Sequence, residues 1–154
     1  MTVYHSTRAI QKVCEIYGSA VTQEMLAIIE WEGYVDGLYT DTDGVQTKGV
    51  GQTGQFKFLP YPQVFELFKR RLLRYTPKLS SFPENVQEAL LVSNYRGDWK
   101  QSPKTRRLFD AGRYQEASVE YLDNEDYREA LSLYPHIARR FEYVAENIRS
   151  LVRV

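Results

Sequence analysis

Several features that would identify common protein classes are missing from this chain. It has one cysteine, Cys14, so no disulfide can form within it. It has no run of about 18 apolar residues, so we expect no membrane span. Lys and Arg together number 20, as do Asp and Glu, and the formal net charge of zero gives no general attraction to nucleic acid or acidic membranes. A partner must therefore be recognised by a local site.

Motifs for metal and cofactor binding are missing as well. His5 and His136 are isolated, with no metal-ligand spacing around either. There is no Walker loop and no G-x-S-x-G, and Gly49-Val50-Gly51 lacks the third glycine and the following helix of a dinucleotide site. We therefore expect no metal, no cofactor and no nucleic-acid partner.

The residues that are present predict one domain with a helical majority. Apolar residues at helical spacing predict a first helix, capped by Ser6 or Thr7 and running to about residue 17, with Cys14 buried on its inner face. A second helix is expected to start at Thr22 and to stop at Gly33. Further helices are expected at about 62–75, 83–95, 103–111, 114–122 and 125–133, and from 135 onward.

Between the second and third helices the pattern changes to that of a β-hairpin. Strands rich in Tyr, Thr and Val are expected at about 38–41 and 45–50, with Asp43-Gly44 as the turn. A lone hairpin is weak in water, so other elements must pack against it. The sequence thus predicts an α+β, mainly helical fold, in which a small hairpin lobe is attached to a helical bundle with a cleft between them.

Two carboxylates in this region have contrasting surroundings. Glu32 follows Ile28 and Ile29 on the same helix face, at the edge of an apolar stripe where desolvation favours the protonated acid. Asp41 stands at the mouth of the turn, where hydroxyls and backbone donors favour the ionised form. Such a pair is typical of acid–base catalysis. The alternatives are a solvated charge near a helix end for Glu32 and an ordinary turn aspartate for Asp41.

The spacing of these residues resembles a known catalytic motif. Glu32, eight intervening residues, Asp41, five intervening residues and Thr47 resemble the Glu–Asp–Thr triad of bacteriophage-type lysozymes, glycoside hydrolase family 24. The likeness extends more loosely over residues 22–150. It includes Gly49-x-Gly51, Ala89 to Asn94 followed by Gly97, Asp110 to Ala117, and Ala138-Arg139-Arg140.

The resemblance implies a lysozyme-like fold and a reaction. The enzyme would be a muramidase that cleaves the β-1,4 bond between N-acetylmuramic acid and N-acetylglucosamine in bacterial peptidoglycan. Glu32 would be the acid. Asp41 would help to position or activate water, or would stabilise the positive charge that grows on the sugar, and Thr47 would help to hold that water.

The resemblance also implies residues that bind substrate or orient the acid. Gln52, Asn94 and Arg139 are the expected substrate-binding residues. One of Arg139 and Arg140 is expected to reach toward Glu32 and orient it, with Arg139 preferred on the alignment. No metal ligand is implied.

The chain departs from the family pattern at several points. Lys48 stands where an aliphatic residue is usual, Gln52 stands where histidine is frequent, and the net charge is zero where many members are basic. Residues 1–20 have no counterpart and predict an added helix that would contact a virion or another protein partner. The single domain, 1–154, would then comprise this helix, a catalytic helix and hairpin lobe at 22–60, and a helical lobe at 61–154.

Three functions stay open at this point. The first is hydrolysis by a bacteriolytic muramidase. The second is a lytic transglycosylase, which needs only Glu32 and has no use for the water-holding pair Asp41 and Thr47. The third is a non-catalytic wall-binding or structural virion module with the same fold.

The expected place of action follows from the first residues of the chain. Residues 1–8 lack the basic start and apolar core of a secretory signal. The protein would therefore be made in the cytoplasm of the host. It would reach the periplasmic wall through a holin lesion, as an endolysin, or as a virion component.

Overall fold

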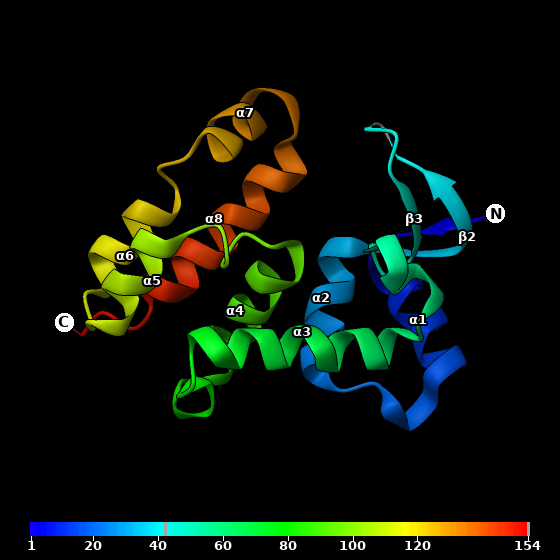
Figure 1. Cartoon of the computed structure of the whole chain (residues 1–154), viewed down its shortest axis with the longest axis horizontal. Coiled ribbons are helices and arrows are strands. Elements are labelled where there is room, and N and C mark those ends of the chain that lie inside the picture. The colour runs from blue at the N-terminus through cyan, green and yellow to red at the C-terminus, as the bar shows by residue number, and fades with distance from the viewer. Residues whose placement is uncertain (42, 154) are drawn as a thin grey trace. The chain divides into compact units, whose positions relative to one another are not determined.

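The structure, a computed structural model, describes residues 1–41 and 43–153 (Figure 1). Over these residues it has eight α-helices and a small four-stranded antiparallel sheet. The expected fold class, α+β with a helical majority, is confirmed. No helix in this described part is long and apolar enough to cross a membrane. The chain divides into two compact units, residues 1–70 and 71–154.

Unit 1 holds the sheet and the first helices. Its elements are β1 (Val3–Tyr4), α1 (Ser6–Tyr17), α2 (Gln23–Glu32), β2 (Tyr34–Thr40), β3 (Gln46–Gly49), β4 (Gln52–Thr53) and the first part of α3 (Tyr61–Tyr75), with 3₁₀ turns at Gly18–Ala20 and Gly54–Phe58. α1 contacts both α2 and β2. The core of the unit is formed by apolar side chains that include Ala9, Val13, Met25, Ile28, Ile29, Val35, Val50, Tyr61, Val64 and Phe65.

The sheet is larger than the predicted hairpin. β2 pairs with β3, with Tyr39 opposite Thr47, and β4 adds to the other side of β3. β1 pairs with the start of β2 and extends that strand back to Tyr34, four residues before the expected start. Because β1 and β4 are only two residues long, they carry no period that a sequence pattern could reveal.

α2 has the predicted ends, whereas α1 does not have the predicted start. α2 follows Thr22, whose Oγ1 accepts a hydrogen bond from the Met25 N–H at 3.3 Å, and it stops at Gly33. At the start of α1, by contrast, the cap position is His5 and Ser6 is the first helical residue, so neither expected cap is used.

The prediction that Cys14 is buried is wrong, because its side chain is exposed. The inner face of α1 is centred on Ala9 and Val13, both of which are fully buried. Cys14 is one residue after Val13, a rotation of about 100° around the helix. That rotation carries its side chain out of the core.

Unit 2 is helical. Its elements after α3 are a 3₁₀ turn at Leu79–Ser81, α4 (Glu84–Arg96), α5 (Pro103–Asp110), α6 (Tyr114–Tyr121), α7 (Glu125–Leu133) and α8 (Pro135–Arg149). Each lies within about two residues of its predicted range, because each has a clear stop or start in the sequence. Pro83 precedes α4 instead of opening it.

The core of unit 2 is built on α4 and on aromatic rings. α4 is buried from Ala89 to Tyr95, and α8 packs against α4, α6 and α7. The fully buried Trp99 ring meets Phe109 edge-on at 5.5 Å between centroids. Tyr121 lies 5.6 Å from Phe141 on α8. These rings fix the helices of the unit against one another.

Candidate active site

Glu32 is the last residue of α2, and its carboxyl group packs against a glycine turn. α2 buries Met25, Ile28 and Ile29, and Glu32 is half-buried at the end of that face, as its spacing predicts. A Cβ atom added to Gly51 would overlap Glu32 Oε2, so the backbone of Gly51 lies directly against the carboxylate. Gly51 has a φ of +57°, in the left-handed region. The acid is therefore seated on the turn that follows β3.

Gln52 holds this turn in place. Its Oε1 accepts a hydrogen bond from the Val50 N–H at 3.2 Å. Its Nε2 donates to the carbonyl oxygens of Phe56 at 2.8 Å and Leu59 at 2.7 Å. The side chain is buried, with 4% of its surface exposed. Gln52 thus has a structural part in the site, and its predicted contact with substrate stays a prediction.

A buried phenol lies near Glu32. Tyr61, at the start of α3, is fully buried, and its hydroxyl donates to the Met25 carbonyl at 2.9 Å. Burial raises the pKa of Tyr61 well above its ordinary value, and the charge of Glu32 raises it further. Sequence reasoning did not find Tyr61, because a tyrosine after a proline at a helix start carries no signal of a neighbouring acid.

Asp41 organises the β2–β3 turn. Its Oδ1 accepts hydrogen bonds from the backbone N–H groups of Asp43 at 2.9 Å and Val45 at 2.8 Å. Its own N–H donates to the Val45 carbonyl at 2.9 Å. This is the turn-aspartate arrangement that the sequence allows for Asp41. The two bonds use one carboxylate oxygen, and they hold the side chain at a fixed place in the loop.

Thr47 belongs to the same hairpin as Asp41. It lies on β3, is 8% exposed, and its Oγ1 contacts the Val45 carbonyl at 3.5 Å. The backbone of Val45 therefore contacts both Asp41 and Thr47. The turn that follows β3 contains Gly51, whose backbone lies against the carboxyl group of Glu32. All three residues of the predicted triad lie in unit 1.

The other predicted site residues lie in unit 2. Asn94 is buried near the end of α4. On α8, Arg139 is exposed, whereas Arg140 is buried and its Nη2 donates to the Val92 carbonyl at 2.9 Å. Orientation of Glu32 by either arginine stays a prediction.

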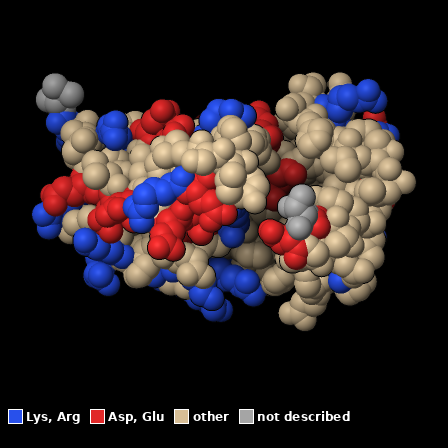
Figure 2. All heavy atoms as spheres, turned by 90° about the horizontal axis from the view of Figure 1, so that it is seen from above, with Lys and Arg blue, Asp and Glu red and all other residues tan. Residues whose placement is uncertain are grey.

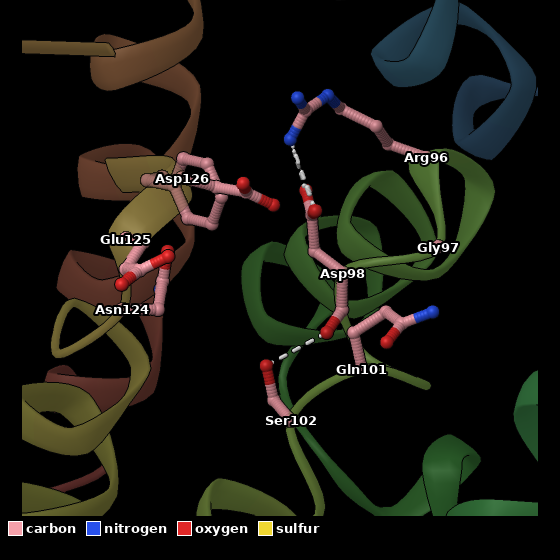
Figure 3. Close-up of a pocket in the computed structure, with 9 residues that line it drawn as sticks. Arg96, Gly97, Asp98, Gln101, Ser102, Asn124, Glu125 and Asp126 are labelled. Carbon is pink, nitrogen blue, oxygen red and sulfur yellow. Dashed lines mark hydrogen bonds and ion pairs between the residues drawn. The ribbon is translucent and has the colours of Figure 1, made fainter. Parts of the chain in front are cut away.

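Unit 2 also contains a polar pocket that sequence reasoning missed. It has a volume of about 560 Å³ and lies where the loop after α4 faces the start of α7. Figure 3 shows Arg96 and Asp98 on one wall and Glu125 and Asp126 on the other. Three carboxylates against one guanidinium favour a positively charged group in this space over an anion. Its residues are far apart in the sequence, so no local motif announces it.

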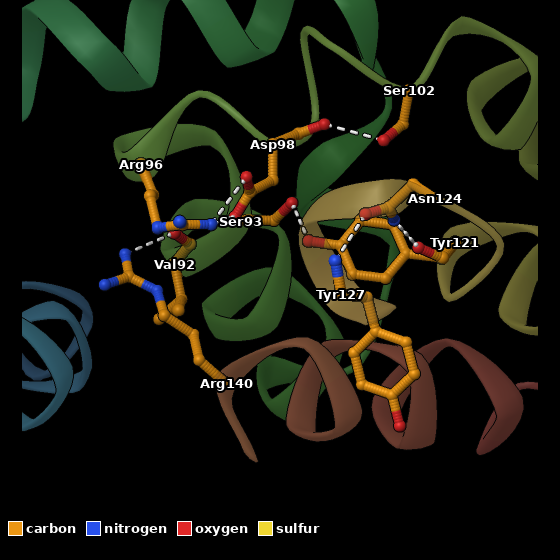
Figure 4. A network of polar contacts seen from close by, with 9 residues as sticks. All are labelled: Val92, Ser93, Arg96, Asp98, Ser102, Tyr121, Asn124, Tyr127 and Arg140. Atoms are coloured by element: carbon orange, nitrogen blue, oxygen red, sulfur yellow. Dashed lines mark hydrogen bonds and ion pairs between the residues drawn. The ribbon is translucent and has the colours of Figure 1, made fainter. Parts of the chain in front are cut away.

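A network of hydrogen bonds supports the wall of this pocket (Figure 4). Arg96 Nη1 donates to both carboxylate oxygens of Asp98, at 2.9 and 3.0 Å, and the Ser102 hydroxyl donates to the Asp98 carbonyl at 2.7 Å. Deeper in the unit, the Ser93 and Tyr121 hydroxyls lie 2.6 Å apart. Burial raises the pKa of Tyr121, so the phenol stays neutral and able to donate.

Asp98 links this network to the pH dependence of stability. Burial raises the pKa of Asp98, while Arg96 and Arg140 oppose the shift and Asp126 adds to it. A carboxyl whose pKa is raised in the folded state stabilises the fold below its ordinary pKa, and this contribution is lost as the pH rises through the raised value.

We therefore expect Asp98→Asn to gain stability relative to the wild type as the pH rises from about 4 toward neutrality. Asparagine keeps the size of the side chain and one oxygen acceptor for Arg96. Urea unfolding of both proteins across this range measures the difference in unfolding free energy. A difference that is constant, or that shrinks with rising pH, would show that the charge of Asp98 does not oppose folding.

Surface charge is mixed on the face shown in Figure 2, where Lys and Arg side chains lie next to Asp and Glu side chains. Neighbouring charges of opposite sign cancel over short distances. This face therefore offers an anionic polymer no extended basic surface. The binding chemistry of the protein has to be sought in its local sites.

Comparison with known proteins identifies no relative of this chain: no family model, no curated protein and no solved structure matches it. The functional argument therefore depends on the residues of the site.

Proposed function

We propose that this protein is a peptidoglycan hydrolase, a muramidase with a lysozyme-like fold. The observation that carries the proposal is the position of Glu32: its half-buried side chain packs against the backbone of the Gly51 turn. The same hairpin carries Asp41 and Thr47. Glycoside hydrolysis uses an acid and a second carboxylate on either side of the scissile bond, and in this proposal Glu32 and Asp41 take these two roles. The cleft that the sequence predicts for the glycan chain stays a prediction.

In the proposed mechanism Glu32 gives its proton to the glycosidic oxygen as the bond from that oxygen to C1 of the N-acetylmuramic acid breaks. Water, held by Asp41 and Thr47, adds its oxygen to C1. The proton lost by this water passes to Asp41, which then releases it to solvent, and solvent returns a proton to Glu32, so that both carboxyl groups regain their starting states. The products are two glycan ends, one of them a reducing N-acetylmuramic acid, and no cofactor takes part.

Mass spectrometry of fragments released from purified Gram-negative peptidoglycan tests this proposal. Reducing-end muropeptides released by the wild type and not by Glu32→Gln are the expected result. Anhydro-muropeptides would instead identify a lytic transglycosylase. No release by either protein would favour a wall-binding or structural virion module. An endolysin and a virion component give the same fragments, so the place of action needs a separate test.

The proposed catalytic role of Asp41 can be separated from its structural role in the turn. Asp41→Asn keeps the Oδ1 atom that accepts from Asp43 and Val45 but removes the charge, so we expect stability to change little and hydrolysis to fall by at least about tenfold. Asp41→Ala loses both bonds and should also destabilise the fold by about 1–3 kcal/mol. Hydrolysis rates and urea unfolding distinguish the two effects.

The matched control for this prediction is Asp43→Asn. The Asp43 side chain is exposed in the same turn. We expect that variant to hydrolyse peptidoglycan at the rate of the wild type. Loss of activity at Asp43 and not at Asp41 would mean that the wrong carboxylate of the turn is assigned.

A further inference from the structure

An aromatic pocket in unit 2, separate from the residues of the proposed catalytic site, has the features of a sugar-binding site. It has a volume of about 480 Å³, which is within the range of small-molecule sites. Its lining comes from the 3₁₀ turn after α3, the end of α5 and the start of α6. The residues that matter here are Pro77, Lys78, Phe82, Phe109, Asp110 and Tyr114.

Three rings form the apolar side of this aromatic pocket. Phe109 is 2% exposed and lies between Phe82, at 5.0 Å, and Tyr114, at 5.3 Å between ring centroids. Phe82 and Tyr114 are half-buried, so part of each ring is open to solvent. Behind them, the buried Trp99 ring supports Phe109 edge-on. The rings are therefore held rigidly and present an apolar surface to a ligand.

The rim of the pocket is polar and has no net charge. Lys78 and Asp110 are both exposed and carry opposite charges. A neutral rim gives no preference for a strong anion or a strong cation. A ligand that fits both parts has a flat apolar face for the rings and hydrogen-bonding groups at its edge for the ammonium and the carboxylate. A pyranose ring has this combination.

We propose that this aromatic pocket binds an uncharged pyranose unit of a glycan and so holds a polysaccharide at a second point on the protein. That the glycan is the N-acetylated chain of the cell wall rests on the proposed function. The binding of sugar by the pocket itself does not, because it depends only on the rings and rim of unit 2.

Nuclear magnetic resonance titration with tri-N-acetylchitotriose tests the inference. The ¹⁵N-labelled Glu32→Gln protein is used, so that the probe is not hydrolysed. We expect amide shifts in residues 78–82 and 109–114. Tyr114→Ala should raise the dissociation constant read from these amides by about tenfold, since it removes one stacking ring. Phe82→Leu keeps apolar volume but removes an aromatic face, so it should weaken binding even if Tyr114→Ala fails to fold.

Tyr134→Ala is the matched control, because Tyr134 is an exposed tyrosine of unit 2 that does not line the aromatic pocket. Tyr134→Ala should bind tri-N-acetylchitotriose with the same dissociation constant as the Glu32→Gln protein in which it is made. Shifts confined to residues 32–52, no shifts at all, or equal weakening by the control would overturn the inference. A failure of the proposed function would be recognised by a different result, the absence of Glu32-dependent fragments. It would leave the result of the titration unchanged.

Discussion

Glu32→Gln is expected to lower the rate of peptidoglycan hydrolysis by at least about 10²-fold while leaving wall binding intact. Glutamine has nearly the same shape and can occupy the same seat against Gly51, but it has no proton to give to a leaving oxygen. The rate of release of reducing ends measures the loss, and sedimentation with insoluble peptidoglycan measures binding. The loss should appear in turnover and not in affinity, because the acid acts in the transition state.

The neighbouring Glu30 provides the control for this experiment. It lies on α2 two residues earlier, about 200° around the helix, and is exposed. Glu30→Gln removes the same charge from the same helix, so we expect it to retain the activity of the wild type. Equal losses of activity in the two variants would mean that the loss comes from removing a negative charge near the end of α2 and not from removing a proton donor. Near-normal activity of Glu32→Gln would exclude Glu32 as the acid and the proposed mechanism with it.

Gly51→Ala is expected to lower the rate of hydrolysis by about 10²-fold, although neither glycine nor alanine has a side chain that could take part in the reaction. The new Cβ would overlap Glu32 Oε2, so the carboxyl group would have to leave its seat. Displacing a catalytic group by about 1 Å can cost about that factor in rate. Alanine with a φ of +57° should also cost roughly 1–2 kcal/mol in unfolding free energy.

Gly54→Ala separates the displacement from the backbone strain. Gly54 has a φ of +55°, so alanine there should cost a similar 1–2 kcal/mol, but a Cβ at this position meets nothing within 4 Å. We expect both variants to lose similar stability in urea unfolding and only Gly51→Ala to lose activity. If both variants lost activity equally, strain in the loop would explain the result, and the contact with Glu32 would have no catalytic importance.

Much of the fold could be predicted from the sequence, and the reason is visible in particular residues. The end of α2 at Gly33 and the turn at Asp43-Gly44 could be predicted because glycine is strongly favoured at the end of a helix and Asp-Gly is strongly favoured in a tight β-hairpin turn. The helices of unit 2 have similar local signals. The prediction for α1 is wrong at Cys14, because apolar positions at helical spacing leave the centre of the buried face undetermined by one residue.

The candidate site could be predicted only where its residues follow one another closely in the sequence. Glu32, Asp41 and Thr47 lie within 16 residues, so their contrasting surroundings and their resemblance to a known motif can be recognised in the sequence. Tyr61 comes near Glu32 through packing between α3 and the core of unit 1, and sequence spacing does not encode such proximity. The sequence indicates Gln52 as a site residue but does not predict that its side chain holds the turn. Its partners are the backbone carbonyls of Phe56 and Leu59, which no sequence pattern marks.

The amide of Gln52 also has a consequence for how the site responds to acid. The turn under Glu32 is held by a side chain that neither gains nor loses a proton in the range where proteins are stable. A titrating residue at this position would release the turn on one side of its pKa and would add its own step to the activity profile. With glutamine there, the seat keeps its shape as the pH changes. Under the proposed function, a change of activity with pH would then not arise from the loss of this turn.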